Sequence, residues 1–412
     1  MSNTLNLLKP IARFALIVVV VAYFASAAAL LFTRYWVLPR VNEWRPDIEA
    51  VMTQSLGAPV KIGEITAEWH SLHPALSLSD LTVLGDDGEP NLLIPSARAI
   101  VSWRSVLHLE PVFSYIGVDQ FELTAVQQAN GLVRVAGFDI DFDEPSDPAL
   151  RKQILNWLGK QGRINLTQAK LTWIDQRQNT PPVSLTDIDV TIENGLLSHR
   201  LGVTANLPSS MGQSVSLMVS ANRLGGSLAS VDERVLDADV FLSVPRLNSE
   251  ALAPWVTLPP VKGTFGGRAW VSLQDGLIEE LTLDLSAADA SGSDATGSGS
   301  SWQVGRAQTR IEGPVGVLWD APESADWITQ APINARLAID VDASDALINE
   351  LSEGLPSLTI DSLSFDSSIQ RTSQEGLTVV ASDFSLANPD GLLTLNGQWQ
   401  RSSSESNGQL DI

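Results

Sequence analysis

Apolar and polar residues alternate with a period of two along most of this chain, and no other feature constrains its fold as strongly. In "INARLAIDV", residues 333–341, apolar side chains occupy every second position. Such a period places successive side chains on opposite faces of a strand. The stretches "LDADVFL", "DIDVTI", "SVSLMVS" and "ELTLDLS" repeat the pattern, and turn-forming stretches such as "LGDDGEP", "NLPSSMGQ", "LQDGL" and "ANPDG" lie between them. The sequence therefore predicts a mostly β fold with an elongated antiparallel sheet.

The second constraint is an uncharged apolar run, residues 14–32, which begins with Phe14 and ends with Phe32. As a helix it would be about 29 Å long, which matches a hydrocarbon core of about 30 Å. Tyr35 and Trp36 follow it, where interfacial aromatic residues belong. A cleavable signal peptide is the alternative, but its apolar region is shorter than this run. We expect a retained anchor, a cytoplasmic tail (residues 1–13) and the bulk of the chain outside the cytoplasm.

Helical spacing of apolar residues interrupts the strands in four places. The first is an amphipathic helix over residues 41–56, directly after the anchor. Asp147 and Pro148 would begin a second helix that ends at Gly159. A shorter helix is expected over residues 249–255, and another over residues 344–353, before Gly354 and Pro356.

Two of the four histidines, His70 and His73, lie in "PVKIGEITAEWHSLHPALSLSDLTVL", residues 59–84. An H-x-x-H pair could bind a metal or transfer protons. However, the flanking residues alternate as in strands, Pro74 favours a turn, and the zinc-protease motif needs H-E-x-x-H on a helix. Along one strand the two imidazoles would point to opposite faces. We therefore expect a turn between two strands here rather than a metal site.

Composition excludes several other functions. The formal net charge of −22 repels nucleic acid, and the absence of cysteine excludes disulfides and thiolate metal sites. The motifs of nucleotide cofactor binding and of serine hydrolases, G-x-G-x-x-G, the P-loop and G-x-S-x-G after a strand, are absent. "DIDFDEP", from Asp139 to Pro145, lacks the glycine and glutamate of an EF-hand loop, although a looser calcium site remains an alternative to an acidic turn. We expect no enzyme, catalytic residue, metal or cofactor.

Composition also suggests divisions within the 412 residues. "SAADASGSDATGSGSS", residues 286–301, is typical of a flexible loop or linker. We expect sheet segments over residues 39–145, 146–285 and 302–412. The last segment would end on an unpaired strand, which suggests a piece of a longer protein.

The order of these features resembles the AsmA-like family of Gram-negative envelope proteins, and most closely its YhdP type. The anchor is followed by "LPRVNEWRPDIEAVMTQSLGAPVKIGEITAEWHSLHPALSLSDLTV" and then by "SARAIVSWRSVLHLEPVFSYIGVDQFELTAV". The family pattern places strand-ending tryptophans at Trp69 and Trp103, a turn at Pro74, an aspartate at Asp80 and a one-turn helix over residues 105–109. "INLTQAKLTWID" and "LGVTANLPSSMGQSVSLMVSANRLGG" are similar to the region that follows.

The resemblance implies an inner-membrane anchor and a long, twisted β-groove that crosses the periplasm and moves phospholipid toward the outer membrane. It implies phospholipid acyl chains and the inner membrane as partners, with other envelope proteins as further candidates. Known members are much longer, so these 412 residues would form an amino-terminal part.

A sheet with one apolar face must cover that face with a second layer or with a ligand. If acyl chains cover it, each buried methylene contributes about 0.8 kcal/mol. The predicted lining of such a groove consists of Ile65, Trp69, Leu76, Leu78, Ile188, Val190, Ile192, Leu217, Val219, Leu281, Leu283, Leu337 and Ile339. The sequence leaves two alternatives to lipid transfer open, an anchored scaffold with a closed apolar core and an anchored hydrolase with an unrecognised site.

Overall fold

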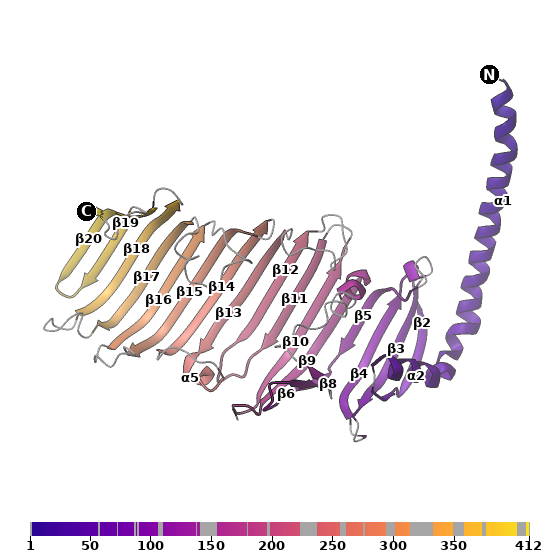
Figure 1. Ribbon diagram of the computed structural model, residues 1–412, viewed down its shortest axis with the longest axis horizontal. Coiled ribbons are helices and arrows are strands. Elements are labelled where there is room, and N and C mark those ends of the chain that lie inside the picture. Colours follow the sequence, from indigo (N-terminus) through magenta and orange to yellow (C-terminus); the bar gives the residue numbers. More distant parts are fainter. Residues whose placement is uncertain are drawn as a thin grey trace. The chain divides into compact units, whose positions relative to one another are not determined.

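The computed structural model describes residues 2–412 except 57, 72, 86–87, 89, 106–109, 137, 141–154, 179, 196–197, 223–236, 256–260, 275–276, 294–300, 314–332, 349–357, 373–375, 402–408 and 412. The described residues are mostly strands, with few helices and one long apolar helix near the N-terminus (Figure 1). The prediction of a mostly β chain with a large antiparallel sheet is therefore confirmed. The chain divides into two compact units, Met1–Phe121 and Glu122–Ile412.

The first unit begins with the helices and continues, among its described residues, with five strands. Its elements are α1 (Ser2–Phe32), the π-helical turn η1 (Thr33–Val37), the 3-10 helix η2 (Leu38–Trp44), α2 (Arg45–Leu56), β1 (Val60–Lys61), β2 (Glu64–His70), β3 (His73–Leu84), β4 (Pro90–Val101) and β5 (Phe113–Asp119). Strands β1 and β2 both pair with β3, and β3, β4 and β5 pair antiparallel in chain order.

The second unit contains the remaining strands, of which β9 and β14–β19 are the longest. They are β6 (Glu122–Gln127), β7 (Val133–Val135), β8 (Phe138–Ile140), β9 (Arg163–Asp175), β10 (Val183–Asn194), β11 (Ser198–Asn206), β12 (Ser214–Asn222), β13 (Ala238–Asn248), β14 (Val261–Gln274), β15 (Leu277–Ser293), β16 (Ser301–Gly313), β17 (Ile333–Ile348), β18 (Leu358–Thr372), β19 (Gly376–Asn388), β20 (Gly391–Arg401) and β21 (Gln409–Asp411). From β9 to β21 each strand pairs antiparallel with the next in the chain, and β6 pairs parallel with β9.

Helix α1 is long and apolar enough to cross a membrane by length and composition. Two hydroxyl groups are satisfied by backbone carbonyls four residues earlier: Ser26 Oγ on α1 donates to Ala22 at 2.7 Å, and Thr33 Oγ1 at the start of η1 donates to Ala29 at 2.9 Å. A polar group in hydrocarbon needs such an internal partner. Its exposed apolar side chains and internal hydrogen bonds fit an inner-membrane anchor.

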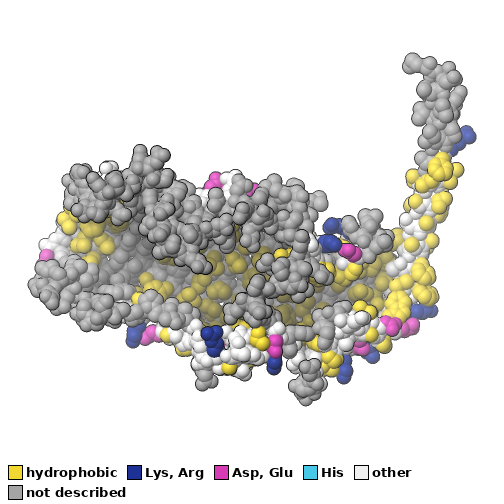
Figure 2. Space-filling model, in the orientation of Figure 1, with side chains coloured by type: hydrophobic (Ala, Val, Ile, Leu, Met, Phe, Trp, Pro, Cys, Tyr) yellow, Lys and Arg dark blue, Asp and Glu magenta, His cyan; other side chains and the backbone are white. Residues whose placement is uncertain are grey.

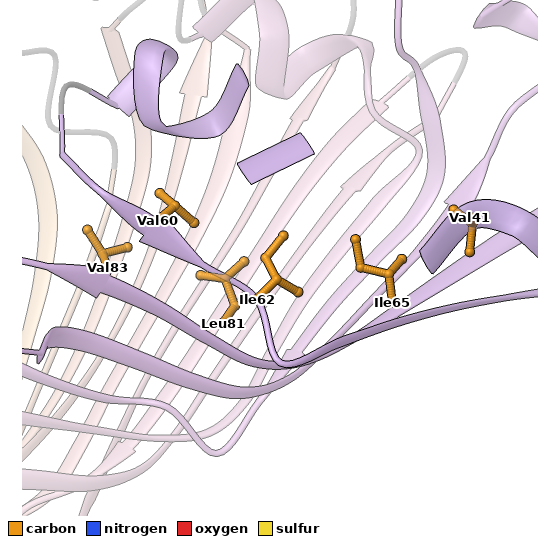
Figure 3. Packing of buried hydrophobic residues seen from close by; sticks show 6 residues of the cluster. All are labelled: Val41, Val60, Ile62, Ile65, Leu81 and Val83. Carbon is orange, nitrogen blue, oxygen red and sulfur yellow. The ribbon is translucent and has the colours of Figure 1, made fainter. Parts of the chain in front are cut away.

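The amphipathic helix predicted over residues 41–56 is present, with its first part in the 3-10 form. Its apolar side packs on one face of β1–β3 in the first unit, and partly buried side chains such as Trp44, Ile48 and Met52 surround the contact. Figure 3 shows the buried cluster, which consists of Val41, Val60, Ile62, Ile65, Leu81 and Val83. This cluster closes one face of the sheet next to the anchor.

Two predictions about local structure are wrong. Residues 344–348 belong to β17 rather than to a helix, because Ala346, Leu347 and Ile348 pair with Ile360, Thr359 and Leu358 of β18. The remainder of that predicted helix lies outside the described residues. The predicted loop at 286–301 is also shorter, since β15 continues to Ser293 and β16 begins at Ser301.

The other predicted helices are found where the structure describes them. Residues 155–160 are helical, and the start of that helix, at Asp147, lies outside the described residues. Helix α5 (Ser249–Leu252) is shorter than expected, and its N-cap is Asn248, whose side chain accepts hydrogen bonds from the N–H groups of Glu250 and Ala251. Of the one-turn helix predicted over residues 105–109, only Ser105 is described, and it is helical.

Candidate functional site

The strand register of the second unit assembles a continuous row of apolar residues across neighbouring strands. Because antiparallel partners lie on the same face, each residue of this row extends the surface of the one before it. At about 4.8 Å for each strand, the row extends about 40 Å from β9 to β17. In order it contains Leu166, Val190, Val203, Leu217, Leu242, Ala269, Leu283, Ile311 and Leu337.

A second apolar row runs beside the first, two residues away along each strand. It contains Ile164, Ile192, Leu201, Val219, Val240, Val271 and Leu281. Together the two rows define what we call the apolar face of the second unit. The face contains seven of the predicted lining residues, namely Val190, Ile192, Leu217, Val219, Leu281, Leu283 and Leu337.

Two further predicted lining residues belong to the same face. Ile339 lies two positions beyond Leu337 on β17 and pairs with Phe365 of β18. Ile188 pairs with Ala169 between two breaks in the β9–β10 register, one on each side of it. At these breaks Gln168 on β9 and Asp187 on β10 adopt positive φ, at 53° and 47°. Such a bulge inserts a residue without turning the following apolar side chains to the other face.

Polar side chains hold this bulge in place. The carboxylate of Asp189 accepts a hydrogen bond from the backbone N–H of Gln168 at 2.9 Å. The side-chain amide of Asn206 on β11 donates to the carboxylate of Asp187 at 3.0 Å. The first bond supplies a partner for a backbone N–H that has left the regular ladder, and the second joins the bulged part of β10 to β11.

The apolar face is incompletely covered by protein. Val190, Ile192, Leu217 and Val219 are half-buried, whereas 43% of Leu242 near the middle of the first row is exposed. The core of a closed sandwich would bury side chains at the centre of the sheet almost completely. Figure 2 shows hydrophobic side chains gathered on a hollowed face, with charged side chains along its margin. Among the described residues, the middle of this face therefore stays partly exposed.

The opposite face of the same strands is mostly polar. One of its rows contains Arg163, Glu193, Arg200, Ser220, Asp239, Ser272 and Glu280. Within it Arg163 lies 3.4 Å from Glu193, and Ser272 Oγ donates to Asp239 at 2.8 Å. An apolar cluster of Met218, Phe241 and Trp270 interrupts this polar face.

In the first unit the predicted lining residues pack at least partly against other side chains of the same unit. Ile65 pairs with Leu78, and Trp69 pairs with Pro74, on the face that η2 and α2 cover. Ile65 is only 2% exposed, so it leaves no surface for a ligand. Leu76 and Leu78 pack at the border of the buried cluster and stay half-buried, as does Trp69. Their contact with lipid stays a prediction.

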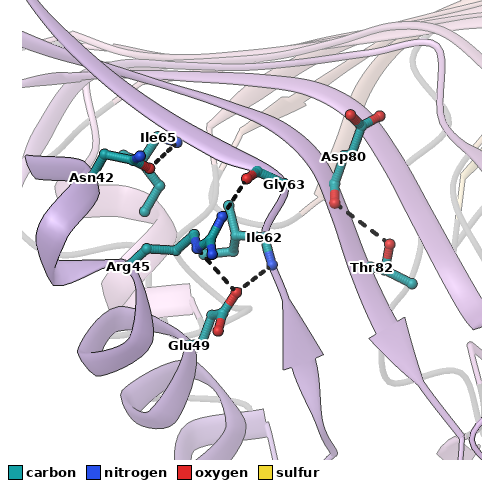
Figure 4. Close-up of polar contacts among 8 residues, drawn as sticks. All are labelled: Asn42, Arg45, Glu49, Ile62, Gly63, Ile65, Asp80 and Thr82. Carbon is teal, nitrogen blue, oxygen red and sulfur yellow. Dashed lines mark hydrogen bonds and ion pairs between the residues drawn. The ribbon is translucent and has the colours of Figure 1, made fainter.

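Side chains of η2 and α2 also occupy the edge of the sheet formed by β1 and β2 (Figure 4). The guanidinium of Arg45 donates to the carbonyl of Gly63 at 2.7 Å. Three other side chains accept hydrogen bonds from backbone N–H groups of the edge, namely Asn42 from Ile65 at 3.2 Å, Glu49 from Ile62 at 2.8 Å and Thr53 from Val60 at 3.0 Å. An edge with occupied N–H groups resists pairing with another strand.

The aspartate of the family pattern, Asp80, lies where the partner of β3 changes from β2 to β1. Strand β3 pairs with β2 up to Ser79 and with β1 from Thr82. Asp80 between them adopts a left-handed φ of 53°, and its carbonyl accepts a hydrogen bond from the Thr82 hydroxyl at 3.5 Å (Figure 4). Aspartate tolerates this conformation better than most residues.

The two histidines flank the turn between β2 and β3, as predicted. His70 ends β2, His73 begins β3, and the two are cross-strand partners, so they share one face rather than pointing to opposite faces. His73 Nδ1 lies 3.1 Å from the carbonyl oxygen of Val101. Among the residues that the structure describes, no cluster of three or more His, Asp or Glu side chains could hold a metal.

In the described part of the acidic stretch, the carboxylate of Asp139 binds an arginine. Arg134 contacts both carboxylate oxygens of Asp139, at 2.8 and 2.9 Å. This hydrogen-bonded guanidinium lowers the pKa of the Asp139 carboxyl below its ordinary value. The other two aspartates of the stretch lie outside the described residues.

Sequence reasoning missed several members of the apolar face. Leu201 and Val203 lie in "SHRLGVTAN", where alternation is present and could have identified them. Val271 and Ala269 lie in "VKGTFGGRAWVSLQ", where glycines and the outward-facing Trp270 obscure the pattern. Only the pairing with β13 and β15 assigns these residues to a face.

At the membrane end, Phe14 and Phe32 lie at either end of the predicted span, and both are exposed on α1. Tyr35 and Trp36 lie on η1 and are 72% and 47% exposed. The ring of Trp36 stacks on that of Phe32 with centroids 4.8 Å apart. These aromatic side chains therefore point away from the buried cluster of the first unit.

Comparison with known proteins gives one family and one curated relative. A model of the YhdP protein family matches residues 1–314. The intermembrane phospholipid transporter YhdP of Escherichia coli (strain K12) is 24% identical over 176 residues, which are 40% of this chain and 14% of that protein. No solved structure matches.

Proposed function

Because this chain belongs to the YhdP family, we propose that it is a membrane-anchored phospholipid carrier whose apolar face holds acyl chains. Helix α1 anchors the chain in the inner membrane, and the strands lie in the periplasm. Phospholipid moves along the face toward the outer membrane, with the headgroup at the polar margin. The chain supplies one length of this path, since its match covers 14% of the relative. No chemical step is involved.

The observation that supports this proposal is the continuity of the first apolar row across nine strands, combined with the exposure of Leu242 near its middle. Moving an acyl chain from water onto such a row is favourable by about 0.8 kcal/mol for each methylene that is fully buried. Because neighbouring row members are similar in polarity, a lipid can slide from strand to strand without a large barrier. A sheet that merely packed on protein would not need an exposed Leu242.

A crosslinking probe on the apolar face tests the proposal. The photoreactive residue p-benzoylphenylalanine replaces Leu242 in the full chain, reconstituted in phospholipid nanodiscs, and phospholipid adducts are measured by mass spectrometry. In this background Leu217→Asp should lower the adduct yield by roughly tenfold or more, because contact with an acyl chain would remove water from the carboxylate at a large cost in free energy. Leu217 pairs with Leu242 on the row, so the charge lies beside the probe.

Met218→Asp is the matched control. Met218 is the next residue on β12, is 53% exposed and points to the opposite face. This variant should keep the adduct yield of the parent. Equal losses in both variants, or no phospholipid adduct in the parent, would contradict the carrier proposal and favour a scaffold that holds no lipid.

A further inference from the structure

Three side chains form a ladder on the connector between the anchor and the sheet. Phe32, Trp36 and Arg40 follow each other at intervals of four residues, and contacts between their side chains place them on one side of the helical connector. The Phe32 and Trp36 rings stack at an interplanar angle of 20°, with centroids 4.8 Å apart. The guanidinium of Arg40 lies over the Trp36 ring at 4.8 Å from its centroid.

The ladder is separate from the packing of the first unit. Leu38 and Val41 on the same connector are buried at 7% exposure, whereas Phe32 is 55% and Trp36 is 47% exposed. Among the described residues no carboxylate forms an ion pair with Arg40. An exposed stack of two large rings that ends in a cation with no described carboxylate partner is suited to contact with a molecule outside the chain.

The spacing of the ladder matches the layers of one membrane leaflet. Phe32 ends the apolar run. The Trp36 ring centroid lies 4.8 Å from that of Phe32, and the Arg40 guanidinium lies 4.8 Å from the Trp36 centroid, so the charge lies within two ring contacts of the hydrocarbon edge. The headgroup layer on each side is about 5–8 Å thick. With α1 spanning a membrane, the guanidinium would lie at the depth of lipid phosphates and Phe32 at the depth of acyl chains.

We propose that Arg40, held over Trp36, binds the phosphate of a membrane phospholipid at the foot of the sheet. The planar guanidinium can donate two parallel hydrogen bonds to phosphate oxygens, and the Trp36 ring restricts its orientation. Phe32 and Trp36 contact the upper part of the acyl chains. Arg34, whose guanidinium lies 5.9 Å from the centroid of the Tyr35 ring, adds a second positive charge nearby. In a chain of net charge −22, these arginines supply a local attraction for anions.

The site lies where the connector meets the buried cluster of the first unit, and it selects lipids that carry a phosphate. The next residues of η2, from Val41 to Trp44, already pack on the strands. A phospholipid held by Arg40 is thus kept beside the membrane-proximal end of the first unit. This inference rests on the proposed function for its ligand class, and on α1 as the anchor.

The test measures lipid preference at the ladder itself. The full chain carries p-benzoylphenylalanine in place of Tyr35, which is 72% exposed and lies outside the ladder. It is reconstituted in nanodiscs that contain equal amounts of phosphatidylglycerol and a neutral diglucosyl diacylglycerol. Adducts should favour the phospholipid by about tenfold in the parent chain. Arg40→Gln should bring the ratio close to one, and Arg40→Lys should give an intermediate ratio because the charge remains.

Controls separate the possible outcomes. Arg104→Gln changes another exposed arginine of the first unit and should leave the ratio unchanged. Millimolar inorganic phosphate should also leave it unchanged, and loss of the preference would assign the site to free phosphate instead of lipid. An equal ratio in the parent and in Arg40→Gln would overturn the inference. The probe at Leu242 reports the sheet independently, so failure of the proposed function and failure of this site can be distinguished.

Discussion

The side chain of Ile65 lies between η2 and the sheet, in the buried cluster of the first unit (Figure 3). Ile65 alternates with polar neighbours along β2, as Val190 does along β10. However, Ile65 is almost fully buried, whereas Val190 is half-buried. The two positions therefore respond differently to substitution. At Ile65 a smaller side chain leaves a cavity, whereas at Val190 solvent or lipid can fill the space.

Ile65→Ala should destabilise the contact between η2 and the first strands by about 2–5 kcal/mol. Hydrogen–deuterium exchange of peptides that cover residues 60–70 should rise accordingly, while exchange in β13–β15 stays unchanged. Thr66→Ala, on the exposed face of the same strand, should change the free energy of opening derived from exchange by less than about 0.5 kcal/mol. Equal protection in both variants would show that the cluster contributes little to the first unit.

At the scale of the element, one face of strand β10 carries apolar side chains like those of a protein core, yet Val190 and Ile192 on that face are only partly buried. Val190 has an apolar partner on each side, Leu166 on β9 and Val203 on β11. Thr191 on the same strand lies on the opposite face, between Asn165 and Gly202. An open face and a closed core predict opposite thermal behaviour for a charge at position 190.

Val190→Asp should lower the stability of the second unit by no more than about 1 kcal/mol, because the carboxylate reaches water on an open face. In a closed core the same charge would be unpaired and would cost several kcal/mol. Thermal unfolding of the full chain in detergent, followed by circular dichroism of the strands, measures the difference. Thr191→Asp serves as the control. A large drop in melting temperature for Val190→Asp alone would contradict an open face at this position.

At the scale of the whole molecule, an apolar N-terminal helix is joined to strands that carry a net negative charge. The helix fits an inner-membrane anchor, and the chain belongs to the YhdP family. The side of the membrane on which the strands lie follows from the proposed function, since lipid transfer toward the outer membrane needs them in the periplasm. Positive charges near the span are similar in number on both sides, so the positive-inside rule gives little direction.

A reporter that is active only outside the cytoplasm, fused after residue 412, should therefore be active, and the same fusion to a cytoplasm-specific reporter should be silent. The chain isolated from membranes should still contain Met1, because α1 is retained. Sequencing that begins near Ala28 or Leu30 would instead identify a cleaved signal peptide. A silent external reporter would place the strands in the cytoplasm and would contradict periplasmic transfer.

Much of the fold follows from local pattern. Alternation identified strands such as 187–192 and 333–341, turn residues separated them, and the uncharged run identified α1, because each signal lies within a short stretch of chain. The same local signals failed at residues 344–348, where helical spacing of Leu347 and Ile348 competes with pairing to β18. They failed again at residues 286–293, where small residues typical of a loop extend a strand because β14 and β16 lie on both sides.

The sequence by itself determined which side chains share a face of a strand, since the period of two is a property of neighbouring residues. It also determined that one segment could cross a membrane, because hydrophobic length is local. Only the tertiary structure decided which rows join across strands and which part of the apolar surface is covered. Register and burial depend on contacts between residues far apart in the chain, so Ile65 became part of a core while Leu242 stayed exposed.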